Sequence, residues 1–97
     1  MTTEHIQTLH PDPGKQGVRI DKAKYDVVRK TILSVLKQNG GMTFTELAAW
    51  VEDELRGSFE GSVMWYLTTV KLDLEARGEI HRVPNSNPQL IMLGETT

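Results

Sequence analysis

Residues 62–80 read SVMWYLTTVKLDLEARGEI, and this stretch decides the fold. Its apolar residues recur at spacings of four, three and four and form one stripe: Val63, Leu67, Val70 and Leu74. The stripe predicts a helix from about Ser62 to Arg77 with one face in the core. Gly78 is a natural left-handed residue at a helix C-terminus, so the helix should end there.

Downstream of Gly78 the sequence predicts a β-hairpin. Residues 79–83 and 89–93 are strand-like, and the intervening residues 84–88, PNSNP, are typical of a five-residue turn. The last four residues, 94–97, are expected to fray.

Upstream, two further helices are predicted. The first spans about residues 21–39, with Asp21 as its N-cap and a Gly-Gly stop at residues 40–41. The second begins at a capping box, Thr43 to Glu46, and ends at Gly57. A short strand at Met42 would lie between these two helices.

Residues 1–20 read as an extended N-terminal arm, because the prolines of HPDPG at residues 10–14 are incompatible with a helix. Four apolar residues should pack part of the arm on the body: Ile6, Leu9, Val18 and Ile20. We therefore expect a mainly α chain with a small β-hairpin (α+β), in which the arm precedes one domain over residues 21–93.

This order of elements resembles the winged-helix variant of the helix-turn-helix, and residues 74–80 resemble the junction from recognition helix to wing. Residues 62–66, 71–74, 10–15 and 18–21 are also similar to a small family of uncharacterised bacterial winged-helix-like proteins. The resemblance implies that the third helix enters the DNA major groove and the hairpin is the C-terminal wing. The implied DNA contacts are Ser62, Trp65, Thr68, Thr69 and Lys71 on the helix, and Arg82, Asn85, Ser86 and Asn87 on the wing.

The distribution of charge disfavours DNA as a partner. Eleven basic and thirteen acidic residues give a net charge of −2. Residues 1–40 carry seven basic and four acidic groups, whereas residues 41–97 carry four and nine. DNA affinity depends on Lys and Arg, so DNA binding would need a dimer or phosphate contacts from Lys15, Arg19, Lys22 and Lys24. The alternative is that these cations form a solvated surface.

A second apolar face, made by Trp65, Leu72 and Ala76, lies almost opposite the core stripe of the third helix. The arm could cover it, it could be a homodimer seam, or it could receive another protein. Two functions follow: a DNA-binding, transcription-regulator-like module, or a module for protein–protein contact or dimerisation that does not bind DNA.

The sequence predicts no enzyme, metal or cofactor. It contains no cysteine, and its three histidines, at positions 5, 10 and 81, are not clustered. The three carboxylates at residues 52–54 would point about 100° apart on a helix and cannot face one another. No apolar run is long enough to cross a membrane and no secretory leader is visible, so we expect a cytoplasmic protein with no membrane partner.

Overall fold

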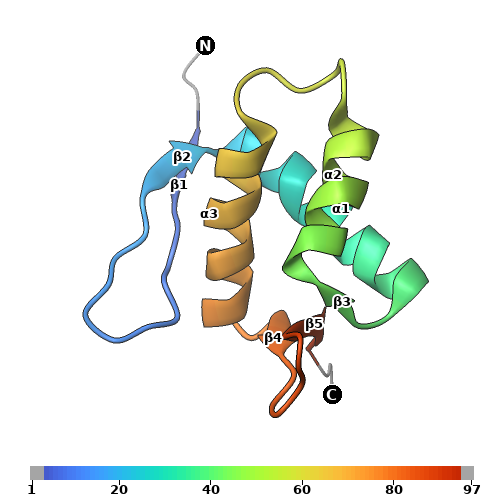
Figure 1. Cartoon of the computed structure of the whole chain (residues 1–97). Coiled ribbons are helices and arrows are strands. Elements are labelled where there is room, and N and C mark those ends of the chain that lie inside the picture. The colour runs from blue at the N-terminus through green and yellow to red at the C-terminus, as the bar shows by residue number, and fades with distance from the viewer. Residues whose placement is uncertain (1–3, 95–97) are drawn as a thin grey trace.

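The computed structural model describes residues 4–94 (Figure 1). Its elements are β1 (His5–Gln7), β2 (Arg19–Asp21), α1 (Lys22–Asn39), β3 (Met42–Thr43), α2 (Phe44–Leu55), α3 (Val63–Ala76), β4 (Ile80–Arg82) and β5 (Leu90–Leu93). The predicted α+β class is confirmed for this range, which contains three helices and two small antiparallel sheets.

Each helix begins at a side-chain cap, and the caps of α1 and α2 are those that the sequence predicts. The Asp21 carboxylate accepts from two backbone N–H groups of the first turn of α1. Thr43 and Glu46 form both hydrogen bonds of the capping box at α2. At α3, the Ser62 hydroxyl accepts from the backbone N–H of Trp65. These caps satisfy donors that a helix N-terminus leaves free.

The three helices enclose one hydrophobic core. Each contributes its apolar stripe, and the C-terminal strands close one end with Ile80 and Ile91. Fully buried helix residues include Val28 and Ile32 from α1, Leu47 and Val51 from α2, and Leu67, Val70 and Leu74 from α3. In Figure 1, α3 lies in front of α1, with α2 on one side and the arm on the other.

The C-terminal sheet has the strand order β3-β5-β4, with every pair antiparallel. Ile91 of the central strand pairs with Met42 on one side and Arg82 on the other. The short strand predicted at Met42 is therefore confirmed. The hairpin strands are one residue shorter at some ends than predicted, and Asn85 in their turn adopts a left-handed conformation with φ of 61°.

The arm contains two short strands that the sequence did not predict. β1 and β2 pair as an antiparallel hairpin in which Ile6 faces Ile20, and the loop between them runs alongside α3 (Figure 1). Ile20 is buried and Ile6 half-buried, whereas Leu9 and Val18 are exposed. Of the tail predicted to fray, residues 95–97 lie outside the described residues, and the Gly94 N–H donates to the Glu79 carbonyl at 2.7 Å.

Candidate interaction face on the third helix

Helix α3 presents an uncharged surface opposite its core stripe. We define the α3 outer face as Met64, Trp65, Thr68 and Leu72. Residues 65, 68 and 72 are three and four positions apart and therefore neighbours on the helix surface. Met64 and Trp65 are 43% and 48% exposed, Thr68 is exposed and Leu72 is half-buried. Large apolar side chains thus meet solvent along a helix whose opposite side is fully buried.

An aromatic cluster supports Trp65 from one side. The Trp65 and Tyr66 rings pack edge to face with their centroids 5.0 Å apart. Tyr66 packs in the same manner against Phe59, at 5.2 Å. The Lys24 ammonium lies 5.3 Å from the Tyr66 centroid and 5.8 Å from that of Phe59. These contacts hold Trp65 in place while leaving nearly half of it exposed.

The two cations predicted to contact DNA from α3 and the wing are both paired with Glu75. The Lys71 Nζ lies 2.6 Å from Glu75 Oε1, and the Arg82 guanidinium contacts Oε2 at 2.9 and 3.0 Å. The Glu75 side chain is only 5% exposed. Lys71 also lies over the Phe44 ring, 5.5 Å from its centroid. One carboxylate therefore contacts both cations beside the outer face, and the three side chains together keep one net positive charge.

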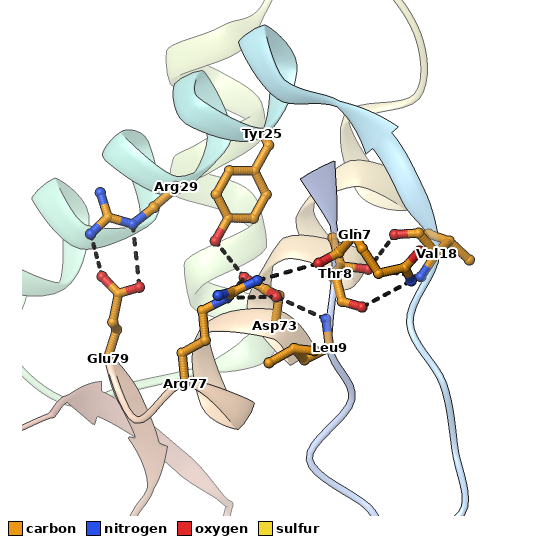
Figure 2. Close-up of polar contacts among 9 residues, drawn as sticks. All are labelled: Gln7, Thr8, Leu9, Val18, Tyr25, Arg29, Asp73, Arg77 and Glu79. Atoms are coloured by element: carbon orange, nitrogen blue, oxygen red, sulfur yellow. Dashed lines mark hydrogen bonds and ion pairs between the residues drawn. The ribbon is translucent and has the colours of Figure 1, made fainter. Parts of the chain in front are cut away.

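A fully buried carboxylate, Asp73, fixes the opposite flank of α3 (Figure 2). It accepts hydrogen bonds from the Tyr25 hydroxyl, from the Leu9 backbone N–H at 2.8 Å and from the Arg77 Nε at 2.9 Å. Arg77 also donates to the Gln7 carbonyl at 3.3 Å. Asp73 and Arg77 thus join the arm, α1 and α3 at one point.

The environment of Asp73 also perturbs Tyr25. Burial, followed by the hydrogen bond to Asp73, raises the pKa of the Tyr25 hydroxyl, because both disfavour the phenolate. The sequence offers one signal for this cluster. Asp73 lies three positions after Val70 and directly before Leu74, at the edge of the core stripe, where a carboxylate requires partners. Its partners come from distant segments and were not predictable from spacing.

The loop of the arm is closed by Thr8 and Gly17. Thr8 is buried, and its hydroxyl donates to the Val18 carbonyl at 2.7 Å and accepts from the Val18 N–H at 2.8 Å. A Cβ at Gly17 would lie 2.2 Å from the Thr8 carbonyl oxygen, so only glycine fits there. This close approach keeps the two sides of the hairpin together next to α3.

The predicted apolar face of Trp65, Leu72 and Ala76 is divided by the arm. Ala76 lines a hollow whose other walls come from the arm, between Gln7 and Gly17. Leu72 is half-buried, while Trp65 stays exposed. The arm therefore borders the C-terminal part of this face and leaves the part around Trp65 and Thr68 open.

The remaining predicted contact residues occupy varied positions. On α3, the Thr68 hydroxyl donates to the Met64 carbonyl and Thr69 is half-buried. In the turn, Asn85 and Asn87 are exposed, whereas the Ser86 hydroxyl closes the hairpin by bonding Val83 and Leu90. In the N-terminal region, Lys15 lies 3.6 Å from Asp12, Lys22 lies 2.9 Å from Asp26, and Arg19 is exposed. The DNA contacts remain predictions.

Two further observations concern residues 4–94. This range holds no group of three histidine, aspartate or glutamate side chains placed to bind a metal ion. Within the same range, no helix has the length and apolarity needed to cross a bilayer.

Comparison with known proteins assigns the chain to a family. Residues 5–91 match the family of unknown function DUF6958, and this match runs from β1 into β5. Neither the curated proteins nor the solved structures gave a match. Because the match covers the arm, the three helices and most of the C-terminal sheet, the chain belongs to the family of unknown function DUF6958.

Proposed function

We propose that this chain is a non-enzymatic winged-helix module whose third helix docks a protein and does not read DNA. The winged-helix assignment is supported by the order α1, β3, α2, α3, β4, β5 and by the central place of β5 in the sheet β3-β5-β4. A fold hosts many functions, so the function is argued from the surface of α3.

The pairing of Lys71 and Arg82 with Glu75 carries the proposal. Protein–DNA affinity comes largely from cations that neutralise phosphates. Residues 62–94 contain three Lys or Arg residues, and each is ion-paired with a carboxylate of α3: Lys71 and Arg82 with Glu75, and Arg77 with Asp73. A phosphate would have to displace these carboxylates, one of which is fully buried.

The outer face has the composition of a protein interface. Tryptophan and methionine are enriched in such interfaces, and tryptophan is prominent among the residues that dominate binding energy. Trp65 is exposed, yet Tyr66 and Phe59 hold it in place. A side chain already fixed in position loses little entropy on binding. These features favour docking of an apolar protein surface.

DNA reading is the second candidate, because the order of elements suits it. Its phosphate contacts would then have to come from the arm and the first helix, where Lys15, Arg19, Lys22 and Lys24 are close in sequence. Lys15 and Lys22 already have carboxylate partners, whereas Arg19 and Lys24 have none among residues 4–94. Lys24 lies over the Tyr66 and Phe59 rings instead. This supply of cations is small for a DNA-binding domain.

A salt titration with random duplex DNA distinguishes the two functions. We expect no saturable binding by the native chain even at low salt. Glu75→Gln should release Lys71 and Arg82 and create weak binding, with a slope of log K against log salt of about −2, close to −0.9 for each of two phosphates. Glu52→Gln is the matched control, since Glu52 is an exposed α2 carboxylate and the charge change is the same. Tight native binding with a slope steeper than about −4 would favour DNA reading.

Photo-crosslinking tests the docking itself. A benzophenone amino acid at Thr68, at the centre of the outer face, should give a discrete covalent adduct in the expressing cell. The adduct should disappear when Trp65→Ala is added. The same label at Thr45, an exposed threonine of α2, should give none. Absence of any Trp65-dependent adduct at Thr68 would contradict a protein-docking function.

A further inference from the structure

We propose that the occupant of the α3 outer face is a second copy of this chain, with the two α3 helices packed antiparallel across a two-fold axis near Thr68 and Thr69. This inference rests on the proposed function, because it names the partner of the same face. A two-fold interface is self-complementary, so one face must supply both sides of the contact.

The sequence of α3 has the required symmetry. With the axis between residues 68 and 69, positions equally distant from it face each other. Trp65 then lies opposite Leu72 of the partner subunit, so that an exposed aromatic meets a recessed aliphatic side chain. The threonines at the axis are of intermediate size, which favours close helix packing.

The charges on and around α3 also suit a symmetric pair. Unpaired like charges near a two-fold axis would face their own copies and repel. Here Glu75 offsets one of the two positive charges of Lys71 and Arg82 before any partner arrives, so that only one net positive charge remains in this group. Antiparallel packing further places the N-terminal end of one α3 beside the C-terminal end of the other, which aligns the helix dipoles favourably.

Glu60 adds complementarity at the two ends. It is exposed, it lies three residues before Val63, the first residue of α3, and within residues 4–94 it belongs to no ion pair. In the antiparallel arrangement it approaches the C-terminal end of the partner's α3. Arg82 lies near that end with its side chain 44% exposed, and the group that it forms with Lys71 and Glu75 keeps one net positive charge. Because the dimer is two-fold symmetric, this attraction between Glu60 and the partner's α3 occurs twice.

The size of α3 sets the expected strength of the dimer. A helix of 14 residues is about 21 Å long. A stable dimer buries about 800 Å² per subunit, about an eighth of the 6437 Å² surface of this chain. One helix face with its flanks supplies less than a large obligate interface, so we expect a dissociation constant of about micromolar order.

Sedimentation equilibrium over a range of concentrations measures this association. The apparent mass of the native chain should rise from 10.9 kDa towards twice that value as concentration passes through the micromolar range. Trp65→Ala should remain at 10.9 kDa throughout. Trp50→Ala is the matched control, because Trp50 is 45% exposed but lies on α2, and it should dimerise like the native chain. Circular dichroism should show that both variants are folded.

Cysteine cross-linking tests the position and direction of the helices, since the native chain has no cysteine. Thr68→Cys lies at the axis and should form a disulfide-linked dimer under mild oxidation, whereas Thr45→Cys on α2 should not. Met64→Cys lies about a turn from the axis and should link to its own copy only if the helices are parallel.

The outcomes separate this inference from the proposed function. A chain that stays monomeric at all concentrations, with no Thr68→Cys cross-link, overturns the homodimer. In that case a Trp65-dependent photo-adduct whose mass differs from twice that of the chain would leave protein docking intact. Efficient self-linking of Met64→Cys would overturn the antiparallel arrangement alone. Salt-dependent DNA binding by the native chain would remove the basis of both proposals.

Discussion

Asp73 is the residue on which the arm, α1 and α3 converge. Its carboxylate is fully buried, and such a group is tolerated only when it is paired and hydrogen-bonded. Tyr25, Leu9 and Arg77 supply the donors. Any substitution at Asp73 therefore acts on three segments at once.

Asp73→Ala should destabilise the chain by about 3–5 kcal/mol, because it leaves a buried hydroxyl, a backbone N–H and a guanidinium without their acceptor. Urea unfolding measures this loss. Asp53→Ala, which removes an exposed carboxylate of α2, should change stability by less than about 0.5 kcal/mol. A loss at Asp73 as small as that of the control would show that the carboxylate does not hold the arm.

Tyr25→Phe removes one of these bonds and leaves the ring in place. We expect a loss of about 1–3 kcal/mol near neutral pH. Because the pKa of Tyr25 is raised in the folded chain, its contribution is complete below the ordinary pKa of 10.0 and decreases as the pH rises above that value. The stability difference between native chain and variant should therefore narrow above pH 10, as measured by urea unfolding at several pH values. A constant difference would contradict a protonated, buried hydroxyl.

At the scale of elements, the arm shows where local sequence stops being informative. The helices were predictable because caps, stripes and glycine stops are local signals, as at Thr43 and Gly78. β1 and β2 have three residues each and are separated by residues 8–18. Their pairing, and the contact of the arm with Asp73, are decided by tertiary structure. The extended arm was therefore predictable from the sequence, whereas the pairing of β1 with β2 was not.

The same limit applies to the candidate site. Trp65, Thr68 and Leu72 were predictable as a surface from helical spacing. The Lys71–Glu75 pair is an i, i+4 contact and could have been anticipated. Arg82 reaches Glu75 only because the chain reverses after Gly78, so the contact of both cations with one carboxylate could be seen only in the folded structure.

Gly17→Ala tests the arm as an element. The added Cβ would meet the Thr8 carbonyl, which cannot move without opening the hairpin. We expect faster hydrogen exchange at the Thr8 and Leu9 amides, which donate to Val18 and Asp73, and a loss of about 1–3 kcal/mol in stability. Gln16→Ala, at the exposed neighbouring position, should leave both unchanged. Native-like exchange in Gly17→Ala would mean that the close approach is unimportant.

At the scale of the whole molecule, the basic N-terminal part and the acidic C-terminal part are joined by an ion pair. Arg29 of α1 pairs with Glu79 at the start of the hairpin, and the hydrogen bond that Arg29 donates to the Glu79 carboxylate raises the pKa of Arg29. Arg77 likewise donates to the arm carbonyl of Gln7 while pairing with Asp73. Arg29 and Arg77 are thus bound to groups within the fold, so these two cations are not free to contact an external polyanion such as DNA.

The ion pair between the two parts predicts whether added salt raises or lowers the stability of the chain. If opposite charges of the two parts attract across the fold, added sodium chloride should screen them and lower the free energy of unfolding, by about 1 kcal/mol or less because the Arg29–Glu79 pair is partly exposed. Glu79→Gln should reduce that dependence, whereas Glu54→Gln, on the exposed side of α2, should not. Urea unfolding midpoints at low and moderate salt measure this dependence for the native chain and for the two variants. Stabilisation by salt would instead mean that repulsion within each part dominates, and a charged partner would then be needed to relieve it.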